Sequence, residues 1–121
     1  MKSLTFVNLL AHPVTLQNNG ILAVVKFMEK SEQSKYFKIE RLVKGFANHR
    51  RIEILFLLEK EPELSVDEIS ERLKVNFNTI SDHIRKLAQS GLVMKRSDGK
   101  SIRHALSDKG KAILSFCKVT G

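Results

Sequence analysis

The stretch from Ser65 to Leu106 constrains the fold most, because two short amphipathic helices and a hairpin are predicted there in direct succession. Ser65 and Glu68 have the spacing of a capping box, in which each side chain accepts a hydrogen bond from the other residue's backbone N–H. The apolar residues that follow recur at helical spacing: Val66, Ile69 and Leu73. A first short helix is therefore predicted to begin at Ser65.

A second helix is predicted at residues 76–90, after a turn at Lys74 and Val75. Asn76 is a natural N-cap, since its side chain can accept from the free amides of the first turn. The inward side of this helix carries apolar residues at i, i+4 and i+7: Ile80, Ile84 and Leu87. Gly91 suits the left-handed position that commonly ends a helix. Polar and basic side chains are left on the other side.

A basic hairpin is predicted directly after the second helix, at residues 92–106. Leu92–Arg96 and Ile102–Leu106 are strand-like runs, and Asp98–Gly99 is a pair favoured in turns that need positive φ. Two helices joined by a tight turn and followed by such a hairpin make a winged helix-turn-helix, a mainly α fold with a β-hairpin wing. A generic small helical domain is the alternative, but such domains seldom place a basic hairpin there.

This fold predicts contact with double-stranded DNA, with helix 76–90 in the major groove and the wing on the backbone or in the minor groove. The candidate contacts of the helix are its polar and basic residues: Asn78, Thr79, Ser81, His83, Arg85 and Lys86. Those of the wing are four basic residues: Lys95, Arg96, Lys100 and Arg103. We expect the helix to read bases and the wing to contact mainly phosphate.

The chain resembles the ArsR-type transcriptional regulators over about residues 36–118. Residues 43–55 resemble the opening of these proteins, where a short turn with an arginine precedes an Ile- and Leu-rich helix. Residues 63–69 resemble the start of their third helix, and 78–87 with 90–93 resemble their recognition helix and the entry to the wing. Residues 98–100 match the wing tip, whereas 107–111 are shared more widely, including with MarR-like and PadR-like regulators. The resemblance implies a cytoplasmic, dimeric, sequence-specific regulator, most often a repressor that occupies an operator.

Metal sensing does not carry over from the resemblance. Metal-sensing members have paired cysteines in the third helix, near where this chain has Ser65 and Asp67, and these residues lack the thiolates that such sites use. Other members place Asp and His ligands along the last helix, where this chain has one thiol, Cys117, and no histidine. Pooling of His104 or Cys117 between two subunits is the remaining alternative. We expect no metal and no other cofactor, and the sequence names no effector.

Two positions of the predicted recognition helix depart from the family's pattern. Phe77 stands where a polar residue is commoner. We expect it to pack against the first helix of the motif, with an apolar contact to a thymine methyl as the alternative. Asp82 stands where a basic or amide residue is usual. We expect it to pair with Arg85 or Lys86, and the alternative is a hydrogen bond from a cytosine amino group.

The positive charge is concentrated in the same region. The formal net charge is +8, and residues 74–121, with ten Lys or Arg and three Asp or Glu, carry +7 of it. Such a distribution is the electrostatic footprint of a protein that binds a polyanion. A membrane surface is the poorer candidate, because the apolar stripes are narrow and are needed for a core.

One core is expected for a domain of residues 35–121. A helix near residues 35–47 supplies Phe37, Leu42, Val43 and Phe46, and the next helix supplies Ile52, Leu55, Phe56 and Leu58. The wing supplies Leu92, Met94, Ile102 and Leu106, in addition to the stripes of the two motif helices.

The last predicted helix, at residues 107–119, is too apolar to stand alone in water. Its apolar residues are Ile113, Leu114, Phe116 and Val119. We expect it to pack with Tyr36, Phe37 and Ile39 of another copy, which gives a homodimer through helices 36–47 and 107–119 that matches a palindromic site. The alternative is that this helix folds back on its own domain.

Residues 1–34 are an extension whose structure and role the sequence leaves open. Leu4–Leu10 and Ile21–Val25 are apolar and β-prone, with turn signals between them, and this pattern permits a strand pair. A secretory signal fits poorly, because His12–Pro13 interrupts the apolar run. A native start at Met28 is an alternative, and disorder or an accessory arm is favoured over it.

Catalysis is not expected. There is no glycine-rich phosphate loop, and nothing in the sequence places Cys117 next to His104, the one conceivable nucleophilic pair. The second hypothesis is therefore another kind of binding protein, a winged-helix module that contacts protein partners in a larger assembly and binds DNA only non-specifically. An acidic partner would satisfy the basic residues as well as DNA does.

Overall fold

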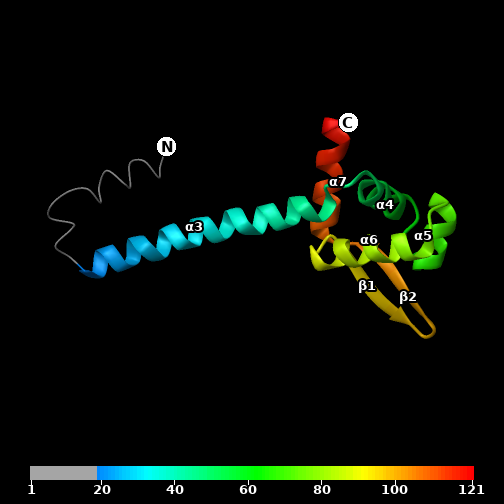
Figure 1. Ribbon diagram of the computed structural model, residues 1–121, viewed down its shortest axis with the longest axis horizontal. Coiled ribbons are helices and arrows are strands. Elements are labelled where there is room, and N and C mark those ends of the chain that lie inside the picture. The colour runs from blue at the N-terminus through cyan, green and yellow to red at the C-terminus, as the bar shows by residue number, and fades with distance from the viewer. Residues whose placement is uncertain (1–18) are drawn as a thin grey trace. The chain divides into compact units, whose positions relative to one another are not determined.

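The computed structural model describes residues 19–121, which form helices and one β-hairpin (Figure 1). In chain order the elements are α3 (Asn19–Phe46), α4 (His49–Lys60), α5 (Val66–Leu73), α6 (Phe77–Gln89), β1 (Val93–Asp98), β2 (Ser101–Leu106) and α7 (Asp108–Thr120). The chain divides into two compact units within α3, one ending at Ile39 and the other comprising Glu40–Gly121. The second unit is mainly helical with a two-stranded antiparallel hairpin, as the sequence predicts.

The N-terminal helix is longer than the one predicted near residues 35–47. The strand pair that the sequence pattern permits is not formed at Ile21–Val25, because these residues lie within α3. Aliphatic and β-branched residues cost a helix only some tenths of a kcal/mol each relative to Ala, so a β-prone composition does not exclude one. The other run of that permitted pair, Leu4–Leu10, lies outside the described residues. The division into 1–34 and 35–121 stays a prediction.

Local signals determine where the two motif helices begin. Ser65 and Glu68 form the predicted capping box: the Glu68 N–H donates to Ser65 Oγ at 3.2 Å, and the Ser65 N–H donates to Glu68 Oε1 at 3.0 Å. Asn76 caps α6 by accepting from the Asn78 N–H at 2.8 Å. Each such cap stabilises a helix by about 1 kcal/mol. Lys74, in the left-handed conformation, ends α5 and makes the tight turn between the two helices.

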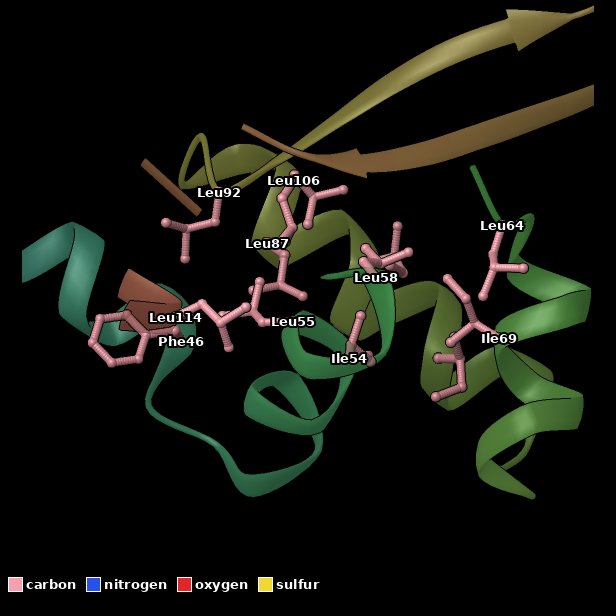
Figure 2. Close-up of a cluster of buried hydrophobic side chains, with 13 residues drawn as sticks. Phe46, Ile54, Leu55, Leu58, Leu64, Ile69, Leu87, Leu92, Leu106 and Leu114 are labelled. Carbon is pink, nitrogen blue, oxygen red and sulfur yellow. The ribbon is translucent and has the colours of Figure 1, made fainter. Parts of the chain in front are cut away.

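A single apolar core joins α4, α5, α6, the base of the hairpin and α7 within the second unit (Figure 2). Its fully buried side chains are Ile54, Leu55, Leu58, Ile69, Ile80, Ile84, Leu87, Leu92 and Leu114. Burial of one such side chain stabilises the fold by about 1.5–3 kcal/mol. The three predicted inward residues of α6 are all among them, so α6 is held firmly against the body of the unit.

Five residues predicted for the core are exposed instead: Phe37, Val43, Phe56, Met94 and Ile102. Phe56 lies on the opposite side of α4 from the buried Ile54 and Leu58, as the helical period requires. Met94 and Ile102 belong to a hairpin that extends beyond the helices, so only its base is buried. The alternation along a strand assigns its two faces but does not reveal how far the core reaches along it.

The hairpin is more regular than predicted. Its register runs from Val93↔Leu106 to Asp98↔Ser101, which leaves only Gly99 and Lys100 in the turn, and Gly99 has a φ of +61°. Leu64 forms an additional bridge to His104 on the outer edge of β2. This bridge joins the base of the wing to the residues just before α5, and the rest of the hairpin projects from the helices (Figure 1).

Helix α7 packs on its own unit through one side. Leu114 is buried there and Ile113 is half-buried against the core, so the predicted alternative of folding back holds for this side. Phe116 and Val119, on the other side, are 56% and 87% exposed. No helix among residues 19–121 combines the length and the hydropathy that a bilayer crossing requires.

Candidate nucleic-acid interface

Helix α6 presents a polar and basic surface on the side away from the core. Of the six residues predicted to contact DNA from this helix, five are exposed: Asn78, Thr79, Ser81, Arg85 and Lys86. The sixth, His83, is half-buried. Because the buried stripe holds the opposite side of the helix, the exposed residues lie together on one accessible surface. We call this surface the α6 face.

Asp82 lies in the middle of the α6 face and pairs with both cations beside it. Its carboxylate accepts from the Arg85 guanidinium and lies 3.3 Å from Lys86 Nζ, which confirms the predicted pairing. The hydrogen bond from Arg85, followed by that from Lys86, holds the pKa of Asp82 below its ordinary value. The face therefore presents a carboxylate between two cations at neutral pH.

Phe77, the first residue of α6, is 46% exposed. The packing against α5 that we expected does not bury this ring. Nearly half of its surface is open to an apolar group such as a thymine methyl, so both interpretations of Phe77 remain predictions.

The wing holds two kinds of basic residue. Lys95 and Lys100 are exposed, and neither forms an ion pair with any residue in the range 19–121. Arg96 is paired instead: its Nη2 lies 3.0 Å from Glu63 Oε1, in the segment before α5. Because no ion pair within the described part of the chain holds them, Lys95 and Lys100 are the wing cations that can meet phosphate.

Arg103 is the second paired residue of the wing, and its contacts reach furthest. Its Nη1 donates to Glu68 Oε1 at 3.0 Å and to the Glu63 carbonyl at 3.2 Å, and its Nε donates to Asp98 Oδ2 at 3.4 Å. These bonds connect the middle of β2 to the start of α5. The sequence predicts Arg103 as a DNA contact, but no local pattern indicates these bonds, since the partners Glu63 and Glu68 lie 40 and 35 residues away.

His83 accepts a hydrogen bond from Arg51, a residue for which the sequence predicts no role. Arg51, in the first turn of α4, donates from Nε to His83 Nδ1 at 3.3 Å. Burial first, and then the charge of Arg51, lowers the pKa of His83 below its ordinary value. The sequence shows only two adjacent arginines at the start of the Ile- and Leu-rich helix, and no local pattern indicates that Arg51 reaches His83, 32 residues later.

Of the other histidine and cysteine side chains in the second unit, His104 and Cys117 pack into the fold, whereas His49 is exposed. His104 is buried, with Nδ1 2.9 Å from the Leu64 carbonyl oxygen, and Cys117 is half-buried against the core. Within the range 19–121, no three His, Cys, Asp or Glu side chains gather in a way that could hold a metal ion.

Helix α6 and the start of the wing lie in a region that matches a family of regulators. Residues 48–95 match the family model described as bacterial regulatory protein, arsR family. The chain is 39% identical over 66 residues to the transcriptional activator HlyU of Vibrio cholerae, an alignment that covers 54% of this chain and 60% of that protein. It is 32% identical over 83 residues to an uncharacterised HTH-type transcriptional regulator of Methanocaldococcus jannaschii, covering 68% of this chain and 93% of that protein.

A similar solved structure is the homodimeric winged helix-turn-helix DNA-binding domain of a possible ArsR-family transcriptional regulator from Mycobacterium bovis. The TM-score is 0.68 at 26% identity, over 74% of this chain and 82% of that one. The chain spans only about three fifths of the length of the first two curated relatives, at 60% and 59%.

Proposed function

Because the chain belongs to the ArsR family of bacterial regulatory proteins, we propose that it is a sequence-specific, double-stranded DNA-binding regulator of transcription that acts as a repressor. The observation that supports this proposal most is the α6 face, an exposed polar and basic surface on a helix anchored by three buried residues. A helix of this kind fits the major groove of B-DNA, where every base pair presents a distinct pattern of donors and acceptors.

The residues divide into readers of bases and contacts to the backbone. Base readers are the residues of the α6 face with His83: Asn78, Thr79, Ser81, His83 and Arg85. Backbone contacts are the lysines: Lys86, Lys95 and Lys100. Arg96 is bonded to Glu63, and Arg103 to the Glu63 carbonyl and to Glu68 in α5. Both orient the wing and reach DNA only by exchanging these partners.

The functional unit is a homodimer. Large apolar side chains are exposed on two helices of the single chain: Phe116 and Val119 on α7, and Tyr36, Phe37 and Ile39 on α3. Exposed apolar residues in such number are typical of a surface that a protein partner covers. The M. bovis domain is homodimeric, which supports a second copy as that partner. A two-fold dimer would read two half-sites about 34–36 Å apart.

The proposed role requires neither catalysis nor a metal or other cofactor, and it locates the protein with the DNA in the cytoplasm. The relatives include proteins named as an activator and as a repressor, so the sign of regulation needs its own measurement. Transcription in vitro from a promoter that carries the selected site should fall as the protein is added. A rise would identify an activator.

Binding is tested by fluorescence anisotropy of the full chain, with a duplex selected from a random pool and a scrambled duplex of the same composition. Specific sites are typically bound about 10³-fold or more tightly than random ones, and we expect a gap of that order with two chains per duplex. Ser81→Ala or Arg85→Ala should reduce the ratio of the affinities for the selected and the scrambled duplex. Lys111→Ala, a change at an exposed residue of α7, should leave this ratio unchanged. Equal weak binding to both duplexes would leave the protein-assembly module as the better account.

A further inference from the structure

Arg51 joins three elements through one guanidinium group. It lies in the first turn of α4, where its N–H donates to the side chain of the N-cap Asn48 at 3.2 Å. Its Nη1 donates to the carbonyl oxygens of Lys44 and Gly45, at the end of α3, at 3.2 and 3.1 Å. Its Nε donates to Nδ1 of His83, in the middle of α6, at 3.3 Å. The ring of His83 is thus connected to the helical body behind it.

This contact determines which ring nitrogen of His83 carries the hydrogen. Arginine has only donors and stays protonated, so the nitrogen it faces must offer a lone pair. In a neutral imidazole one nitrogen is a donor and the other an acceptor. With Nδ1 of His83 accepting from Arg51, the hydrogen lies on Nε2.

The ring is neutral at physiological pH. The pKa of His83 is lowered first by burial and then by the positive charge of Arg51 from α4. Lys86 of α6 and His49 of α4 lower this pKa by smaller amounts. Asp82, the neighbouring carboxylate, opposes them but pairs with its own two cations. A second proton would also have to enter at Nδ1, where Arg51 already donates.

Nε2 is the nitrogen that remains available. Within residues 19–121, the hydrogen bond from Arg51 is the only one that the His83 ring forms. Nε2 has no partner in that range, yet it is not one of the buried polar atoms that lack a hydrogen bond, so it is accessible. Nε2–H is therefore open to solvent on α6, one turn from the exposed Thr79 on one side and Lys86 on the other.

We propose that Arg51 makes His83 a donor-only reader of one base in the major groove. A donor can meet purine N7, guanine O6 or thymine O4, but it cannot accept from the amino group that cytosine presents there. His83 is the specificity-determining residue, and Arg51 is a positioning residue that acts through it. This inference rests on the proposed function, and it assigns a chemical preference to one position of the operator.

The tautomer is tested without DNA, by long-range ¹H–¹⁵N correlation spectra of the full chain at pH 7.5. His83→Asn identifies the His83 signals among those of the four histidines. We expect the Nε2–H form in the wild-type protein and a mixture of both forms in Arg51→Met, which keeps the aliphatic stem and removes the donor. Arg50→Met is the matched control, because Arg50 pairs with Glu53 and should leave His83 unchanged. A dominant Nδ1–H form, or an unchanged tautomer in Arg51→Met, would overturn the proposal.

The base preference is tested by selecting duplexes from a random pool with the wild-type protein, Arg51→Met and Arg50→Met. The wild type should reject cytosine at one position of each half-site. In Arg51→Met the discrimination against cytosine there should fall about tenfold, within the range of one good base contact, with the other positions unchanged. A uniform loss of affinity for all duplexes would assign His83 to phosphate or to structure and would refute the reading role. If the wild type has no sequence preference at all, the proposed function fails, and the spectra still decide whether Arg51 sets the tautomer.

Discussion

At the scale of single residues, charges that look alike in the sequence differ in the fold according to their partners. Lys95 and Lys100 form no ion pair within residues 19–121, whereas on the same hairpin Arg96 is bonded to Glu63, and Arg103 to Glu63, Glu68 and Asp98. The pairing of Asp82 follows from its spacing to the cations that come three and four residues later, so it was predictable. Apart from Asp98, which lies on the same hairpin as Arg103, the partners of the wing arginines come from a segment more than 30 residues earlier, and no local pattern indicates them.

Removing the carboxylate of Asp82 should strengthen binding to any duplex. Asp82→Asn frees Arg85 and Lys86 for phosphate, so affinity for a scrambled duplex should rise several-fold at low salt. The slope of log K against log salt should steepen by about 1 for each additional phosphate contact. Asp108→Asn, which removes an equal charge from the first turn of α7, is the control for net charge. Equal effects of the two variants would mean that the position of Asp82 on the α6 face is irrelevant.

Protonation of His104 should destabilise the protein in acid. Burial is the main cause that lowers the pKa of His104 below its ordinary value of 6.5, outweighing the opposing bond to Leu64. Since the unfolded chain then takes up the proton before the folded one, this contribution is absent above pH 6.5 and destabilises the fold as pH falls below it. His104→Asn keeps a donor near the Leu64 carbonyl and removes the titration.

Thermal melts of the wild type and His104→Asn between pH 7.5 and 5 would measure the effect. The melting temperature of the wild type should fall more steeply over this interval than that of the variant. His83, which titrates in the same direction, is present in both proteins and cancels in the comparison. Parallel curves would contradict the role assigned to His104.

At the scale of elements, two glycines allow helices to approach their neighbours closely. A Cβ added at Gly45, near the end of α3, would lie 1.9 Å from Ser90 Oγ, after α6. A Cβ added at Gly110, in α7, would lie 2.2 Å from the backbone oxygen of Leu92. The elements themselves were predictable from Ser65 onwards, because caps, turn residues and periodicity are local signals. The close approach of one helix to another depends on both partners and was not predictable.

Alanine at these two glycines should destabilise the fold in ways that a second change can distinguish. Overpacking typically costs about 1–3 kcal/mol, more than the gain of up to about 1 kcal/mol in helix propensity. For Gly45→Ala, the double variant with Ser90→Gly should recover much of the loss, since the clash is with a side chain. Gly110→Ala meets backbone, so Ser90→Gly should not rescue it. Urea unfolding gives the free energies of unfolding of the wild type, the two glycine variants and the two double variants. Rescue of both glycine variants by Ser90→Gly, or of neither, would contradict this packing.

The wing should separate into residues that bind and residues that orient. Lys95→Ala and Lys100→Ala should each weaken binding to all duplexes alike and reduce the salt slope by about 1. Arg103→Ala should change the slope little, because its charge is shared with Glu68 and Asp98. It should instead lower the free energy of unfolding by up to about 1 kcal/mol. Titrations at four salt concentrations with a urea series on each variant make the comparison, and a slope change in Arg103→Ala equal to that of the lysines would assign it to phosphate.

At the scale of the whole molecule, the single chain leaves apolar surface on both α3 and α7. Their periodicity suggested burial, and for α7 only one side is buried within the chain. A sequence pattern indicates that a residue is destined for an apolar environment but not whether its own chain or another supplies it. This is the physical reason why Phe37 and Val43 were assigned to the core although both are exposed here.

The proposed dimer should depend on the exposed side of α7. Phe116→Glu should shift the chain from dimer to monomer in sedimentation velocity at micromolar concentration, because it would bury a charge in an apolar contact. Met94→Glu is the control, since Met94 on the wing has the same exposed fraction of 56% as Phe116. A monomer should also lose the affinity that comes from binding two half-sites at once. Dissociation by both variants, or by neither, would exclude this side of α7 as the contact.

Asp82 also affects how fast the protein finds its site on DNA. A repressor must find one site among roughly 10⁶–10⁹ competing ones, and its non-specific contacts let it slide and hop between them. With Arg85 and Lys86 already held by a carboxylate, each phosphate contact on a wrong sequence must first break an ion pair. Every visit to a random sequence is then shorter, and more sequences are sampled in each second. On the proposed function, the carboxylate lowers the affinity for random sequences and thereby speeds the search for the operator.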